Sequence, residues 1–140
     1  MNLRYPKNLH FECQRCAKCC GDGSHRGRNI LLLEFEVKRI SKTTGSRPLS
    51  FASRSLSVQP YRYRMKKRGG KCVFLYGKAC RIYKIRPLIC RFYPFSLKKG
   101  SNGYKFEFSE KCPGIDIGNA LKKSDFERMF EEAKKILQYS

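Results

Sequence analysis

Four cysteines within eight residues, in the string CQRCAKCC at positions 13–20, constrain this chain more than any other feature. Thiolates separated by two residues can converge on one point, so the string indicates a soft-metal site for zinc or an iron–sulfur cluster. The adjacent pair Cys19 and Cys20 adds a restriction, because neighbouring side chains usually diverge. The pair therefore indicates two sites that share a loop, a multi-iron cluster, or one ligand beside a spare thiol.

Four further cysteines follow, with seven, nine and twenty-one residues between them. The spacing differs from a zinc ribbon, which needs two close pairs about 15–20 residues apart. It also differs from the bacterial ferredoxin run C-x2-C-x2-C-x3-C-P, because Cys20 directly follows Cys19. Eight thiols fit two four-cysteine sites, or one cluster, of the 4Fe–4S type among others, with thiols left over. We predict as metal ligands Cys13, Cys16, Cys19, Cys20, Cys72, Cys80, Cys90 and Cys112.

Three alternatives bear on these cysteines. Cys72, Cys80 and Cys90 each neighbour apolar residues and would also suit a core as small hydrophobic side chains. Disulfides are the second alternative, because the cytosol of hyperthermophiles permits them. His10 and His25 flank the string and would suit zinc, although a lone histidine near a metal is more often a surface residue.

The charge of the chain is strongly positive and unevenly distributed. The formal net charge is +20, and residues 37–106 contain 19 Lys and Arg but no Asp or Glu. Aromatic residues are interleaved with the basic ones, as in YRYRMKKR. This basic 37–106 region predicts a polyanionic partner, which would be a nucleic acid, an anionic substrate or an acidic protein.

The sequence predicts a cytoplasmic protein. The first residues contain no apolar core of a secretory signal, and no apolar run approaches the 18 residues of a membrane span. In a reducing compartment, eight cysteines favour metal over disulfides.

The pattern along the chain predicts one α+β domain over residues 1–140. Leu33, Val37 and Ile40 recur at helical spacing within a predicted helix at 34–44. A second helix is expected at about 124–138, with Ser124 and Glu127 as a capping box. Antiparallel strands are expected at 29–33, near 61–65, at 72–76 and 80–83 around a turn at 77–78, and at 104–108, with a loop at 109–118. Two or three helices and short strands would thus be tied together by metal.

The ordered motifs are more specific than the cysteine count. They are F-x-C-x-x-C-x-x-C-C at 11–20, C-x-F-L at 72–75, C-x-I-Y-x-x-R-P at 80–87, C-R-x-Y-P-F at 90–95 and C-P-G at 112–114. In this order they resemble the zinc- or iron-chelating CxxCxxCC family. The resemblance implies a small cysteine-rich fold that chelates zinc or an iron–sulfur cluster. Ala17 is a departure, because many relatives carry glycine after the second cysteine.

The sequence says less about the biological role of the protein than about metal binding. Some relatives of this family are flagellin lysine methylases, so the resemblance also implies a methyl-transferring enzyme that uses S-adenosylmethionine as an alternative. A basic nucleic-acid-binding metal module is the other alternative. Arg86 and Arg91 adjoin the cysteine motifs, and we expect their charges to neutralise a thiolate-rich site. The sequence therefore predicts a metal-binding protein whose metal serves structure, redox chemistry or sensing.

Overall fold

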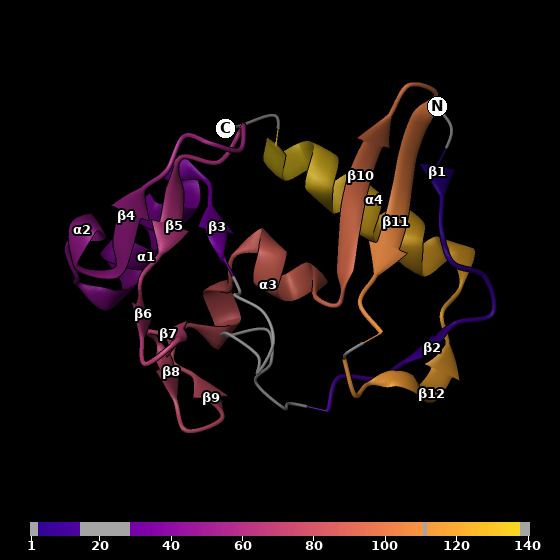
Figure 1. Cartoon of the computed structure of the whole chain (residues 1–140), viewed down its shortest axis with the longest axis horizontal. Helices are drawn as coiled ribbons and strands as arrows, with labels where there is room; N and C mark the ends of the chain where they lie inside the picture. Colours follow the sequence, from indigo (N-terminus) through magenta and orange to yellow (C-terminus); the bar gives the residue numbers. More distant parts are fainter. Residues whose placement is uncertain (1–2, 15–28, 111, 138–140) are drawn as a thin grey trace. The chain divides into compact units, whose positions relative to one another are not determined.

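The computed structural model describes residues 3–14, 29–110 and 112–137, and the chain forms two compact units. Unit 1 comprises Met1–Cys16 and Phe92–Ile136, and unit 2 comprises Ala17–Arg91 and Leu137–Ser140. Each unit combines helix with small sheets of short, mostly antiparallel strands (Figure 1), so the predicted α+β class is confirmed.

Unit 1 is built on a three-stranded sheet in the order β1-β11-β10. Strand β1 (Leu3–Arg4) runs parallel to β11 (Gly103–Phe108), and β10 (Phe95–Gly100) pairs with β11 as an antiparallel hairpin. The alternation of YKFEF at 104–108 predicts β11, and one face of the strand is indeed apolar.

Helix α4 (Lys123–Leu137) covers that apolar face through aromatic pairs. The Phe126 ring lies 5.5 Å from the Phe106 ring and 5.1 Å from the Tyr5 ring, and the Phe130 ring lies 5.0 Å from that of Tyr104. Phe126 is completely buried, as the helical spacing of the apolar residues in this segment predicts.

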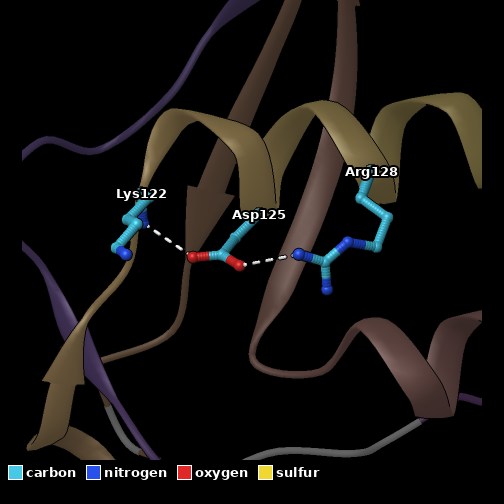
Figure 2. A network of polar contacts seen from close by, with 3 residues as sticks. All are labelled: Lys122, Asp125 and Arg128. Carbon is cyan, nitrogen blue, oxygen red and sulfur yellow. Dashed lines mark hydrogen bonds and ion pairs between the residues drawn. The ribbon is translucent and has the colours of Figure 1, made fainter.

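The start of α4 differs from the predicted capping box (Figure 2). The Lys122 backbone N–H donates to Asp125 Oδ2 at 2.7 Å, and Arg128 Nη2 donates to Asp125 Oδ1 at 3.1 Å. The helix begins at Lys123, so Ser124 lies inside the first turn and the box of Ser124 with Glu127 is wrong. A carboxylate accepts a stronger, charge-assisted bond than a hydroxyl, which favours the start that uses Asp125.

A second small sheet in unit 1 pairs β2 (His10–Phe11) with β12 (Ile115–Ala120) in antiparallel register. The expected loop at 109–118 is therefore wrong for its last residues. The strand is irregular, with positive φ values of 70° at Asp116 and 79° at Gly118, and its register shifts between Ile115 and Ala120. A bulged strand lacks the two-residue alternation by which strands are predicted.

Unit 2 holds the sheet β3-β5-β4 and helix α1. Strand β5 (Tyr63–Met65) pairs with β3 (Leu31–Leu32) and with β4 (Ala52–Arg54), so strands near 29–33 and 61–65 are confirmed. Helix α1 (Glu34–Thr44) has the predicted bounds. It ends where the Gly45 N–H donates to the Ser41 carbonyl at 2.9 Å, with Gly45 at φ 73°. The short helix α2 (Pro48–Phe51) precedes β4 and was not predicted.

Two hairpins and a short helix complete unit 2. Strand β6 (Lys67–Arg68) pairs with β7 (Lys71–Cys72) through Gly69 and Gly70, both at positive φ as a tight hairpin turn requires. Strand β8 (Leu75–Tyr76) pairs with β9 (Ala79–Cys80) around the predicted turn. A 3₁₀ turn (Tyr83–Ile85) and helix α3 (Leu88–Phe92) then lead the chain from unit 2 into unit 1.

Over the described ranges, none of the helices combines the length and the apolar character that a bilayer crossing requires.

Candidate metal centre

Unit 1 brings the first cysteine of the chain close to the last. Phe11 pairs with Ile115, and the Glu12 N–H donates to the Gly114 carbonyl at 3.0 Å. Cys13 directly follows Glu12, and Cys112 precedes Gly114 by two residues. The β2–β12 pairing therefore lays the two cysteine-bearing segments side by side, with Cys112 buried and Cys13 exposed.

The glycine of the C-P-G motif makes this approach possible. A Cβ atom at Gly114 would overlap the backbone carbonyl oxygen of Glu12 and would also press on the Phe11 ring. Only a residue without a side chain lets the two backbones come this close. The motif thus combines one thiol, Cys112, with a close backbone contact to Glu12, the residue before Cys13.

Unit 2 gathers three cysteines around one apolar cluster. Cys72 ends the first hairpin, Cys80 ends the second, and Cys90 lies in α3. Cys72 and Cys90 belong to the cluster, with 6% and 8% of their surface exposed, and the half-buried Cys80 packs against it. The other buried members of the cluster are Ile30, Leu32, Val37, Ile40, Phe51, Ala52, Met65, Phe74 and Ile82. The three cysteines, which are up to eighteen positions apart in the sequence, thus contact the same cluster.

The sulfur of Cys72 accepts a backbone hydrogen bond. The Phe74 N–H donates to Cys72 Sγ at 3.4 Å, across the turn that joins the two hairpins. A donor two residues after a cysteine stabilises negative charge on sulfur, which is the form that binds metal. The chemistry of this position therefore fits a thiolate ligand for zinc or an iron–sulfur cluster.

A buried carboxylate connects α1 to the helix that carries Cys90. Glu36 is only 2% exposed. Its Oε1 accepts the Leu33 N–H at 2.9 Å, and its Oε2 accepts the Leu88 N–H at 2.7 Å. Both donors belong to the first turns of helices, where backbone N–H groups have no partner within the helix. One side chain thus caps α1 and fixes the start of α3, two residues before Cys90.

The electrostatics of Glu36 follow from its position. Burial raises the pKa of its carboxyl above the ordinary value of 4.5, because the charged form loses its hydration. The two backbone donors, Arg91 and Arg39 oppose this rise in pKa. The pKa of Tyr61 is also raised, first by burial and then by the negative charge of Glu36.

The two arginines proposed near the thiolates have other contacts in the structure. Arg86 Nε donates to the Tyr83 carbonyl at 2.9 Å, and the guanidinium carbon lies 3.8 Å from the centre of the Tyr83 ring. The charge of Arg91 acts on Glu36. Neither contact involves a cysteine, so the role of these arginines beside the thiolates stays a prediction.

His10 has a structural partner. Its Nδ1 lies 2.7 Å from the Gly118 carbonyl oxygen, so the ring ties β2 to the bulge of β12. In the structure, the exposed His10 side chain therefore connects β2 to β12.

Part of the predicted ligand set lies outside the described residues, namely Cys16, Cys19 and Cys20, together with His25. Within ranges 3–14, 29–110 and 112–137, no three His, Cys, Asp or Glu side chains come close enough together to hold a metal ion. Among the described residues, Cys13 and Cys112 belong to unit 1, and Cys72, Cys80 and Cys90 contact the apolar cluster of unit 2 without lying close enough together to hold a metal ion by themselves.

Glu36 was not predicted from the sequence as a residue of the site. The pattern was nevertheless present, because Leu33, Glu36, Val37 and Ile40 share one helical face at three- and four-residue spacing. A single acid on an otherwise apolar, buried helix face predicts a carboxylate that is hydrogen-bonded to backbone groups, because burying a charge without partners would cost the fold too much free energy.

Comparison with known proteins gives a family match and two uncharacterized relatives. A family model, CxxCxxCC, described as a putative zinc- or iron-chelating domain, matches residues 12–114. Uncharacterized protein MJ0661 of Methanocaldococcus jannaschii is 28% identical over 96% of this chain and 72% of its own length. Uncharacterized protein MJ0939 of the same organism is 29% identical over 84% of this chain, which spans 41% of that relative. No solved structure matches.

Proposed function

Because the chain belongs to the CxxCxxCC family of zinc- or iron-chelating domains, we propose that it binds its metal through cysteine thiolates and that the metal stabilises the fold. The family match supports chelation. The proposed ligands are Cys13, Cys16, Cys19, Cys20, Cys72, Cys80, Cys90 and Cys112.

The arrangement of cysteines in unit 2 is the observation that carries this proposal. Cys72, Cys80 and Cys90 come from two hairpins and a helix, yet all three contact one apolar cluster. Three strands of only two residues each position the first two of them. Such short hairpins are marginal without a further crosslink, and a bound metal supplies one.

The chemistry that the bound metal would supply depends on whether it is zinc or an iron–sulfur cluster. Zinc would join thiolates as a fixed crosslink, and an iron–sulfur cluster would add one-electron redox chemistry. The residues of the chain orient the sulfurs: the Phe74 N–H stabilises charge on Cys72, and Glu36 fixes the start of the helix that presents Cys90.

Metal analysis with a visible spectrum, on protein purified without oxygen, tests the proposal. A brown protein with iron and sulfide indicates a cluster, and a colourless protein with stoichiometric zinc indicates zinc. Protein that is folded, holds neither metal and keeps its melting temperature after treatment with a chelator would refute metal chelation.

Single cysteine variants test the division of the ligands. Cys90→Ser and Cys112→Ser each remove one thiol, the first from unit 2 and the second from unit 1. With two independent sites, each variant loses part of the metal and the double variant loses all of it. With one shared cluster, either variant loses all of it. Unchanged metal content in both variants would remove these two residues from the ligand set.

A further inference from the structure

Strand register in unit 1 places three cations side by side across the sheet. Arg4 of β1 pairs with Lys105 of β11, and Lys105 pairs with Lys98 of β10. Directly paired residues lie on the same face of a sheet, so these three side chains form one row. Neighbouring strands are about 4.8 Å apart, so the row is about 10 Å long. We call it the cation row.

The cation row lies on the face of the sheet opposite to α4. Tyr104 and Phe106, the neighbours of Lys105 in β11, pack on Phe130 and Phe126 of the helix. Successive side chains of a strand point to opposite faces, so Lys105 points away from α4. Figure 1 shows α4 behind β10 and β11. The three cations of the row are all exposed.

The cation row lowers the stability of the sheet. Like charges directly opposite each other in a sheet destabilise it. Among the described residues, no ion pair involves Arg4, Lys98 or Lys105. The carboxylate of Glu107, paired with Ser96 two positions along the strands, is the acid that shares this face. An external anion would relieve the repulsion within the row.

An open cavity of about 1160 Å³ continues from one end of the row. Arg4 and Lys105 belong to its lining, together with Lys7 and Lys123, so four cations surround it. Two carboxylates, those of Glu107 and Glu110, also line it. The positive surface therefore extends beyond the three paired strands.

We propose that the cation row binds the phosphate backbone of a nucleic acid, independently of base sequence and of the proposed metal chelation. A nucleic-acid strand carries one phosphate for about every 3.4 Å of helix axis, so three successive phosphates span about 7 Å, and the long side chains of the row, which start about 10 Å apart at its ends, can converge on them. An acidic protein surface has no such regular repeat. The rings of Tyr104 and Phe106 in β11 pack on α4, so these two rings cannot stack on bases.

Salt dependence of binding tests this assignment on the full-length, metal-containing protein. With three phosphates neutralised, log Kobs should fall against log salt with a slope of about −2.7 on duplex DNA and about −2.1 on a single strand. On the duplex this is about a forty-fold loss of affinity between about 50 and 200 mM salt. Duplex and single-stranded probes of mixed sequence, each beside a homopolymer of equal length, should show no sequence preference.

Two matched variants localise the effect. Lys105→Thr removes the central cation and keeps a residue suited to strands, so the duplex slope should become about −1.8. Lys98→Thr should do the same from the neighbouring strand. Lys135→Ala removes an exposed cation from the last turn of α4, and it should leave the slope unchanged. Circular dichroism melting of each variant verifies that the fold is kept.

Three results would overturn the proposal. One is binding that does not respond to salt. Another is an equal loss of slope in Lys105→Thr and Lys135→Ala, which would show that only total charge matters. The third is tighter binding to poly-glutamate than to oligonucleotides at equal charge concentration, which would assign the row to acidic proteins.

Discussion

Replacement of Glu36 tests whether one carboxylate holds the start of α1 and the start of α3 together. Glu36→Ala leaves the Leu33 and Leu88 N–H groups without their acceptor in a buried place. A buried donor left without a partner costs about 1–3 kcal/mol, so the two donors together cost about 2–6 kcal/mol. Glu34 is exposed in the same helix turn, and Glu34→Ala should cost less than about 1 kcal/mol.

Glu36→Gln removes the ionisable group and keeps only one of the two acceptor oxygens, so the pH dependence of its stability, rather than the stability at one pH, reports on the charge. Burial raises the pKa of Glu36 above 4.5, so over a window above that pH the folded protein keeps a proton that the unfolded chain has released. The resulting stability is complete below pH 4.5 and is lost as the pH rises through the folded-state pKa. Glutamine does not ionise. The free energy of unfolding of Glu36→Gln, relative to wild type, should therefore rise across this window, by about 1.4 kcal/mol for each pH unit that it spans.

Urea unfolding followed by circular dichroism, at a series of pH values and with metal content held constant, measures both effects. The Glu36→Ala cost should exceed the Glu34→Ala cost at every pH. Equal costs in the two alanine variants would refute the double-cap role of Glu36. A relative stability of Glu36→Gln that falls with increasing pH would show that the hydrogen bonds and arginines outweigh burial.

Three further substitutions test packing and capping in unit 1 by urea unfolding. Gly114→Ala forces a Cβ against the backbone of Glu12, the residue after β2, and should cost about 1–3 kcal/mol. Gly100→Ala, where a Cβ meets only ordinary contacts, should cost less than about 1 kcal/mol, and similar costs in the two variants would contradict the close approach of Gly114 to Glu12. Asp125→Ala removes the bond to the Lys122 N–H and should cost about 0.5–2 kcal/mol, more than Glu127→Ala; a larger effect of Glu127→Ala would restore the rejected capping box. Phe126→Ala empties the completely buried contact between α4 and its sheet and should cost about 3–5 kcal/mol, and a cost below about 1 kcal/mol would place this ring outside the core.

Local patterns predicted the elements that depend on local sequence. Helix α1 was predicted to the residue, because Leu33, Val37 and Ile40 repeat at helical spacing and Gly45 ends the pattern. The hairpin of β8 and β9 was predicted from Gly77 at its turn, where φ is 63°. In each example the decisive interactions join residues fewer than ten positions apart.

Pairing between distant segments could not be predicted. Strand β1 has only two residues, and its place beside β11 is set by contacts about a hundred residues away along the chain. The same is true of β12, whose bulge hides the alternation, and of the cation row, which needs the register of three strands. The capping error had another cause. Two sets of acceptors, Asp125 alone and Ser124 with Glu127, offered helix starts only two residues apart, and the bond of the Lys122 N–H to Asp125 marks the start that formed.

The family was predicted from the sequence, but the arrangement of the cysteines was not. The cysteine pattern identified the family, and the match over residues 12–114 confirms it, whereas the set of metal ligands stays a prediction. The pattern did not show that Gly114 brings Cys112 towards Cys13, or that Cys72, Cys80 and Cys90 contact one core. Both arrangements depend on backbone pairing across long stretches of sequence.

The discontinuity of unit 1 sets an order of events during synthesis. Met1–Cys16 leaves the ribosome first, but the segments that complete its unit begin only at Phe92. At about 5–20 residues per second, translation of the intervening segment takes about 4–15 s. Throughout that interval the segment that contains Cys112 has not yet been made, while unit 2 is already being synthesised. The nascent chain therefore has time to fold unit 2, with Cys72, Cys80 and Cys90, before β2 can pair with β12 and complete unit 1.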